Sequence, residues 1–370
     1  MDAAAGLARP AESAGALVES ASARLAAAGI ATARLDAEVL LAEASGRDRT
    51  ALYTGWRREL PTGCRTRFAA LLTRRLAREP LQYIVGRQEF WSLDFMLTPA
   101  VLIPRPETEL LIELASRLLT GTESGSPLPP EGTPNEPAVP THIRHARNLL
   151  AGIQAGRKGG AMEGWTGRGD STSPFPLLGK EGVHWPNRSV HQRQSESQGE
   201  SSRGLRLCDL GSGSGCIAVA LARELPRADI WALDISAAAL AVAKTNARRH
   251  AVAERIHFFQ SDLLAAVRAP RFDAIISNPP YVRSADLRRA QPELGWEPAQ
   301  ALEGGTSGLD VIERVVTQSY DCLKPDGWLI MEIGAGQGGA AERLGHAAGF
   351  SSVSVAPDYA GLPRALVARR

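Results

Sequence analysis

The sequence lacks the features that mark several classes of protein. Its 370 residues contain no apolar run near the roughly 20 residues that a membrane-spanning helix needs. A basic start followed by an apolar stretch is also missing, so we expect no signal peptide and no membrane contact. Lys and Arg number 42 against 40 for Asp and Glu, and this net charge of +2 does not favour a protein held to nucleic acid by phosphate contacts.

Cysteine is scarce as well. The four cysteines include no Cys-x-x-Cys pair, so no zinc site or other metal site is predicted. Cys208 and Cys216 lie eight residues apart around a turn and are expected to be small buried apolar side chains. We expect reduced thiols in a cytoplasmic protein.

Residues 1–87 are predicted to form a small bundle of four or five helices. Ala and Leu recur at helical spacing, and Gly29, Gly46 and Pro61 separate the segments. The region holds no phosphate-binding loop and no catalytic cluster. A packing or partner-docking domain is the expected role.

Residues 88–105 have a different pattern and are predicted to be a β-hairpin linker. Apolar residues partly alternate from Phe90 to Leu97, and a second short run lies between Pro99 and Pro104. Residues 106–119 then return to a helical pattern, with Pro106 or Thr108 near its start.

Residues 121–204 are expected to be a disordered insertion. This stretch contains 14 Gly, 9 Pro and 9 Ser, and neither a strand nor a helix period persists along it. Such a composition buries too little apolar surface to offset the entropy of ordering. Its four histidines, His142, His145, His184 and His191, are predicted to be solvated rather than ligands.

From residue 205 onward, strand and helix patterns alternate. Strands are predicted at 205–210, 229–234, 256–261, 272–277, 328–333 and 352–357 and at 365–369, with helices at 214–224, 236–250 and 309–322. This alternation predicts an α/β, Rossmann-like domain over 106–370, with a mostly parallel sheet covered by helices on both faces. A ligand is then expected at the carboxyl ends of the strands.

A glycine-rich loop closes the first of these strands. Asp209 is followed by Leu210 and then by a loop whose alternate glycines let the backbone bend sharply and approach a ligand; the loop residues are Gly211, Ser212, Gly213, Ser214 and Gly215. Asp234 ends the next strand and can accept both ribose hydroxyls of a nucleoside. The spacing differs from the dinucleotide and P-loop patterns, which favours a nucleoside without phosphates, S-adenosylmethionine. Asp209 is expected to bond the loop backbone or, through water, the methionine ammonium, and Asp262 the adenine amino group.

Asn278-Pro279-Pro280-Tyr281 follows the fourth strand. Two successive prolines stiffen the backbone, so the Pro279 carbonyl and the Asn278 side-chain oxygen become two acceptors at a fixed separation. They match the two hydrogens of a planar NH2 group, and Tyr281 can pack on a flat substrate. This chemistry suits a methyltransferase that acts on an amide or an aromatic amine, with the catalytic residues Asn278, Pro279 and Tyr281 stabilising the positive charge that moves to nitrogen.

These motifs resemble the HemK/PrmC family, the N5-glutamine methyltransferases of peptide chain release factors. The resemblance covers about residues 15–119 and 205–370. The matching segments are Gln88–Trp91, Ile103–Glu109, Asp209–Gly215, Ser277–Tyr281, Glu297-Pro298, Ala301-Leu302, Gly304-Gly305 and Asp358–Arg364.

The resemblance implies a helical N-terminal domain that docks the release factor, a hairpin linker and a seven-stranded methyltransferase domain. It implies that the substrate is the glutamine of the Gly-Gly-Gln motif in class 1 release factors. By carry-over, the glycine loop and Asp234 bind the cofactor. Asn278 contacts both the cofactor and the substrate amide, and Pro279, Pro280 and Tyr281 complete the substrate pocket. Leu263 is also predicted to contact the cofactor; some members have an aromatic residue at this position, which leaves open what stacks on adenine in this chain.

Several alternatives stay open. Arg105 and Glu107 either order the pocket rim or simply belong to a helix start, where Pro106 and the acidic residues are favourable. A DNA adenine-N6 methyltransferase would use the same Asn-Pro-Pro-aromatic clamp, but it would need base flipping and a target-reading domain. A ribosomal-protein glutamine methyltransferase and an inactive release-factor scaffold are further options. Nothing in the sequence suggests an obligate oligomer, so a monomer is expected.

Overall fold

The computed structural model describes residues 13–121, 204–267 and 272–370. The predicted insertion and its four histidines therefore lie outside the described residues, apart from Gly121 and Gly204 at its ends. Within the described part of the chain, no helix is long and apolar enough to span a membrane.

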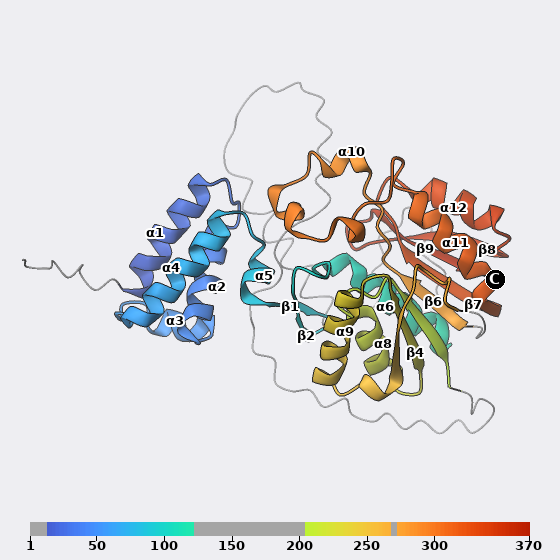
Figure 1. Ribbon diagram of the computed structural model, residues 1–370, viewed down its shortest axis with the longest axis horizontal. Helices are drawn as coiled ribbons and strands as arrows, with labels where there is room; N and C mark the ends of the chain where they lie inside the picture. The colour runs from blue at the N-terminus through green and yellow to red at the C-terminus, as the bar shows by residue number, and fades with distance from the viewer. Residues whose placement is uncertain (1–12, 122–203, 268–271) are drawn as a thin grey trace, which may run out of the picture. The chain divides into compact units, whose positions relative to one another are not determined.

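Five helices occupy residues 14–85, the upper number expected from the sequence (Figure 1). They are α1 (Ala14–Ala27), α2 (Ala33–Ser45), α3 (Arg49–Thr54), α4 (Thr62–Leu76) and α5 (Leu81–Val85). Ser13 and Asp48 cap α1 and α3, because their side-chain oxygens accept from the backbone N–H groups of Ala16 and Ala51. The apolar faces of the helices share one core, whose fully buried members include Val18, Leu25, Leu40 and Leu41.

A β-hairpin follows, but its position differs from the prediction. Strands β1 (Arg87–Phe90) and β2 (Leu93–Met96) pair antiparallel, so both strands lie within 87–96 and no strand lies between Pro99 and Pro104. Trp91 and Ser92 form the two-residue turn with φ of 54° and 58°. Turns of this kind usually carry Asn-Gly or Asp-Gly, and this chain has neither, which is why the turn was missed.

The rest of the chain forms a seven-stranded sheet of order β5-β4-β3-β6-β7-β9-β8. Its strands are β3 (Arg206–Leu210), β4 (Asp229–Asp234), β5 (Ile256–Gln260), β6 (Phe272–Ser277), β7 (Leu323–Glu332), β8 (Ser352–Pro357) and β9 (Pro363–Arg369). The first five pair parallel, and β9 is antiparallel to both β7 and β8. The predicted α/β class is confirmed, although β7 begins five residues earlier than expected.

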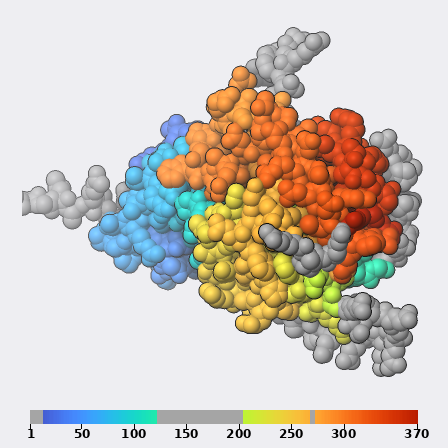
Figure 2. Space-filling view, turned by 45° about the vertical axis from the view of Figure 1, so that its right-hand side comes forward, coloured from blue at the N-terminus to red at the C-terminus, as the bar shows by residue number. Residues whose placement is uncertain are grey.

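Helices cover both faces of the sheet. They are α6 (Glu109–Thr120), α8 (Cys216–Glu224), α9 (Ala237–Arg249), α11 (Asp310–Cys322) and α12 (Gly338–Ala347). Helices α6 and α8 share a buried apolar cluster with one face, and α11 and α12 share one with the other. Figure 2 shows α9 and the edge strand β5 (yellow) at the surface. Short helices complete the chain: α10 (Ser284–Leu287), η1 (Pro106–Thr108), η2 (Ala253–Arg255), η3 (Pro292–Trp296) and η4 (Ala299–Ala301).

The strand order indicates that a ligand binds at the centre of the sheet. The chain runs outward from β3 through β4 to β5, and then returns to the other side of β3 with β6. Loops that leave the carboxyl ends of β3 and β6 therefore diverge, and ligands of open α/β sheets bind in the space between such loops. The glycine loop follows β3 and the Asn-Pro-Pro-Tyr segment follows β6.

Candidate active site

The glycine loop folds back beneath the end of β4. The backbone N–H groups of Gly211 and Ser212 donate to the Leu233 carbonyl at 2.8 and 2.9 Å. Gly215 has φ +78°, and a Cβ there would lie 2.9 Å from the Cβ of Ala243, so only glycine permits this close approach of α9. At Gly213 (φ +53°) no atom lies within 4 Å of the position of a Cβ, which leaves room for a ligand beside the backbone.

Asp209 lies fully buried beneath this loop. Its Oδ2 accepts from the Ser212 hydroxyl at 2.6 Å and from the Ala218 N–H at 3.1 Å. No group in the described part of the chain hydrogen-bonds its Oδ1. Burial, together with the nearby charge of Asp234, raises the pKa of Asp209 to about 7. A buried carboxylate oxygen without a protein donor fits a donor or cation that comes from a ligand or a water.

Asp234 ends β4 beside the same loop. Its two carboxylate oxygens accept from the N–H groups of Gly213 and Ser236, both at 2.8 Å. Burial raises its pKa, while these two bonds oppose the shift. An ionised carboxylate offers about four lone-pair positions, so two acceptor positions are left for hydroxyl groups.

The two residues predicted beyond β5 lie differently. The Asp262 carboxylate is exposed and pairs with Arg314 at 2.7 Å. Leu263 has φ +49° and packs partly against the core cluster that contains Leu233 and Leu264. The Asp262 carboxylate therefore pairs with Arg314 through its Oδ2, at the surface beyond the end of β5.

The Asn-Pro-Pro-Tyr segment lies next to the glycine loop. Leu210 and Ser277 are register partners in β3 and β6, and the Ser277 hydroxyl donates to the Leu210 carbonyl at 2.7 Å. A Cβ on Gly211 would lie 4.0 Å from the Asn278 carbonyl oxygen. Pro279 is buried, while Asn278, Pro280 and Tyr281 are half-buried. The structure therefore brings the two predicted motifs together.

Two further polar side chains support this segment, and the sequence interpretation missed both. The Asn278 Nδ2 donates to the Thr108 Oγ1 at 3.0 Å, and the Thr108 hydroxyl donates to the Glu332 Oε2 at 2.6 Å. The Tyr281 hydroxyl donates to the other oxygen of Glu332 at 2.9 Å. Burial raises the pKa of Glu332, and burial together with the Glu332 charge raises that of Tyr281. Glu332 is an acidic residue directly after the apolar run Trp328–Met331, which was the one local signal for it.

Arg105 and Glu107 have different partners in the structure. Arg105 is buried, and its Nη2 pairs with the Glu297 Oε1 at 2.5 Å, while the Glu297 Oε2 accepts from the Ile103 N–H at 3.1 Å. Glu107 is half-buried in η1, next to Thr108, and its charge helps to raise the pKa of Glu332. Arg105 therefore orders the segment after β6, which carries Glu297. Pro106 opens the helical turn, as the alternative reading expected.

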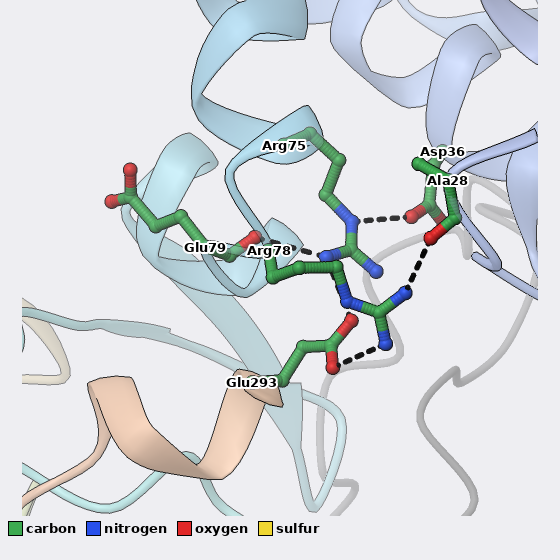
Figure 3. A network of polar contacts seen from close by, with 6 residues as sticks. All are labelled: Ala28, Asp36, Arg75, Arg78, Glu79 and Glu293. Atoms are coloured by element: carbon green, nitrogen blue, oxygen red, sulfur yellow. Dashed lines mark hydrogen bonds and ion pairs between the residues drawn. The ribbon is translucent and has the colours of Figure 1, made fainter. Parts of the chain in front are cut away.

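A second buried carboxylate of the segment after β6 pairs with the helical region (Figure 3). Glu293 in η3 accepts from Arg75 at 3.0 Å and from Arg78 at 2.7 Å. Arg75 also donates to Asp36 at 2.7 Å and to the Glu79 carbonyl at 3.1 Å. Glu293 and Glu297 therefore attach the segment that follows Tyr281 to α4 and to the linker.

Two family models match the chain. The PrmC N-terminal domain matches residues 16–86, and the methyltransferase small domain matches residues 198–295. The first match falls on the five helices and the second spans the glycine loop and the Asn-Pro-Pro-Tyr segment.

Curated relatives match over nearly their whole length. The release factor glutamine methyltransferase of Moorella thermoacetica is 34% identical over 94% of this chain and 95% of its own. The protein of that name from Geobacter sulfurreducens is 33% identical over 93% of this chain and 92% of its own. The one from Koribacter versatilis is 33% identical over 95% and 96%.

Proposed function

Because this chain belongs to the family of release factor glutamine methyltransferases, we propose that it methylates the side-chain amide nitrogen (N5) of a glutamine. The methyl donor is S-adenosylmethionine, and the glutamine is that of the Gly-Gly-Gln motif in class 1 peptide chain release factors. The observation that carries the proposal is that the glycine loop and the Asn-Pro-Pro-Tyr segment leave the sheet after register partners, Leu210 and Ser277, in the neighbouring strands β3 and β6.

The glycine loop and the carboxylates of Asp209 and Asp234 hold the methyl donor, S-adenosylmethionine. The Oδ1 of Asp209, which has no hydrogen-bond donor among the described residues, takes a hydrogen bond from the methionine end, directly or through water, and the remaining lone pairs of Asp234 accept the ribose hydroxyls. Asp262 accepts from the adenine amino group. When bound, S-adenosylmethionine would supply an electrophilic methyl group, and its sulfur would keep the electron pair of the bond that breaks as the amide nitrogen bonds the methyl carbon.

Asn278 and Pro279 hold the acceptor. The nitrogen of an amide is a poor nucleophile because its lone pair is delocalised into the carbonyl. The Asn278 side-chain oxygen and the Pro279 carbonyl accept the two amide hydrogens, which aims the nitrogen at the methyl group and stabilises the positive charge that develops there. The ring of Tyr281 lines the pocket. After transfer the nitrogen releases one proton to water, which restores a neutral amide.

The helical region and the methyltransferase region have different roles. We assign docking of the release factor to residues 1–87, linkage to 88–105 and catalysis to 106–370, in a cytoplasmic monomer. The pairing of Arg75 and Arg78 with Glu293 supports this division, because it connects the docking helices to the segment that continues from Tyr281.

A transfer assay tests the function. The chain, methyl-labelled S-adenosylmethionine and a bacterial class 1 release factor are combined, with a Gln→Ala variant of the Gly-Gly-Gln motif as the matched control. We expect label on the wild-type factor alone. Label on duplex DNA would support the adenine alternative, and label on a ribosomal protein the other glutamine alternative.

Asp209→Asn tests the donor site. The amide keeps an acceptor for Ser212 and Ala218 but removes the negative charge near the methionine ammonium. We expect affinity for S-adenosylmethionine to fall about 10- to 100-fold, the usual worth of a hydrogen bond to a charged group. In the wild type the ionised fraction of Asp209 grows as pH rises through about 7, so affinity should rise from about pH 6 to about pH 7.5.

Calorimetric titration with S-adenosylmethionine at several pH values measures both effects. The Asp209→Asn variant should show a flat pH profile over that range. An unchanged affinity, or an equal pH dependence in both proteins, would show that Asp209 does not face the donor.

A further inference from the structure

We propose that Thr108 and Glu332 are positioning residues that fix which way the side-chain amide of Asn278 faces. The inference rests on the proposed function, in which the Asn278 oxygen must face the substrate amide. The three side chains form one line of hydrogen bonds from the end of β7 through η1 to the end of β6.

The direction of this line is set at Glu332. As a carboxylate, Glu332 can only accept, and it is fully buried, so each of its oxygens needs a donor. Tyr281 donates to one oxygen and Thr108 to the other. The single hydroxyl hydrogen of Thr108 is therefore used, and the Thr108 oxygen presents only lone pairs to Asn278.

Asn278 must then turn its NH2 group toward Thr108. The reversed amide would place its oxygen against the lone pairs of Thr108, or would require Thr108 to abandon Glu332 and leave a buried carboxylate oxygen without a donor. With Nδ2 bound to Thr108, the Asn278 oxygen is left facing away from it, as an acceptor for one amide hydrogen of the substrate. Asn278 alone is thus not sufficient to hold the substrate amide, because Thr108 and Glu332 must also orient its side chain.

The groups around Glu332 determine whether it is ionised, and so affect the direction of these hydrogen bonds. The Arg364 charge and the hydrogen bonds from Thr108 and Tyr281 favour ionised Glu332, whereas burial and the charge of Glu107 favour the protonated form. Protonated Glu332 could donate to Thr108, and Thr108 could then donate to Asn278. Such a reversal would turn the Asn278 NH2 group toward the substrate.

Thr108→Val and Thr108→Ser test the inference as a matched pair. Valine keeps the branched shape and removes the hydroxyl, whereas serine keeps the hydroxyl. We expect Thr108→Val to lower kcat about 10- to 100-fold with little change in the affinity for S-adenosylmethionine, because misalignment of a reacting group has costs of that size. Thr108→Ser should recover most of the loss. Glu332→Gln, whose amide can donate to Thr108, should lose kcat like Thr108→Val.

The orientation itself can be observed by nuclear magnetic resonance. The chain contains five asparagines, so selective ¹⁵N labelling gives few side-chain NH2 signals, and the signal that Asn278→Ala removes is that of Asn278. Slow hydrogen exchange at this group is expected in the wild type and in Thr108→Ser, and fast exchange in Thr108→Val.

The outcomes separate the inference from the proposed function. If the wild type methylates the release factor and Thr108→Val retains its kcat, the inference is overturned and the function stands. If the wild type transfers no label, the function fails, and the exchange measurement still decides whether Thr108 holds the Asn278 amide. Equal exchange in Thr108→Val and the wild type would overturn the inference in either case.

Discussion

Replacing Asn278 with alanine is expected to abolish methyl transfer while leaving the affinity for S-adenosylmethionine nearly unchanged. The substitution removes the side-chain oxygen that accepts one amide hydrogen, but it leaves the glycine loop, Asp209 and Asp234 in place. Loss of one preorganised polar contact at a reacting centre costs about 3 kcal/mol or more, which corresponds to at least about 100-fold in kcat.

Single-turnover transfer to a release factor and calorimetric binding of S-adenosylmethionine measure the two halves of this prediction. Ser284→Ala is the matched control, because Ser284 lies shortly after Tyr281 and its backbone N–H, rather than its side chain, bonds Gly305. That control should keep both activity and affinity.

Two results would contradict the clamp. Turnover in Asn278→Ala close to that of the wild type would show that the acceptor amide is held by other groups. A parallel loss of affinity for S-adenosylmethionine would show that Asn278 acts chiefly on the methyl donor. The glycine loop lies next to the Asn278 carbonyl oxygen.

The sheet and the glycine loop could be predicted from the sequence because the patterns that indicate them lie within short segments of the chain. Strands β4 and β6 begin and end at the predicted residues, and the buried cysteines Cys208 and Cys216 are as expected. Apolar alternation and closely spaced glycines depend on neighbours within a few residues. The strand order, which only the structure shows, then places the glycine loop beside the Asn-Pro-Pro-Tyr segment.

The hairpin turn could not be placed in the same way. Trp91 and Ser92 adopt positive φ although neither residue type favours it, so the usual glycine or asparagine signal is absent. Two partners hold this region from elsewhere in the chain. The Trp91 N–H donates to Glu109 at 2.8 Å, and the Asn246 side chain bonds both the N–H and the carbonyl of Met96. Tertiary contacts thus stabilise a turn that local preference does not.

The supporting polar groups of the site were missed for a related reason. Thr108 and Glu332 lie 224 positions apart, and Arg75 and Glu293 lie 218 apart. Each residue taken alone has an ordinary local explanation, as a helix start, a strand end or a charge on a helix. Their pairing follows only from the fold, and a single sequence carries no signal for it.

Arg75→Met is expected to destabilise the protein by about 3–5 kcal/mol, the usual cost of removing one partner from a buried ion pair. Arg75 and Asp36 are both buried, and Arg75 is the charged partner of Asp36 that the described structure shows. Without it, Asp36 is a buried carboxyl group that has lost this partner, and Glu293 retains Arg78. Denaturant unfolding measures the change, with Asp326→Asn as the control. The Asp326 carboxylate is exposed and pairs with Arg369 at 3.0 Å, so its neutralisation should cost at most about 1 kcal/mol.

A double substitution distinguishes two causes of the expected loss of stability: the unpaired carboxyl group of Asp36 and the lost packing of Arg75. Asp36→Leu together with Arg75→Met removes both charges and fills the space with apolar groups, and such replacements are often neutral or stabilising. We therefore expect the double variant to recover most of the stability that Arg75→Met loses. It should still bind the release factor more weakly, because Glu293 remains without Arg75 and the segment after Tyr281 loses one of its two ion pairs with the helical region. Full recovery of both stability and the KM for the release factor would show that Arg75 serves the helical core alone. Recovery of stability without recovery of KM would show that Arg75 also holds the segment after Tyr281.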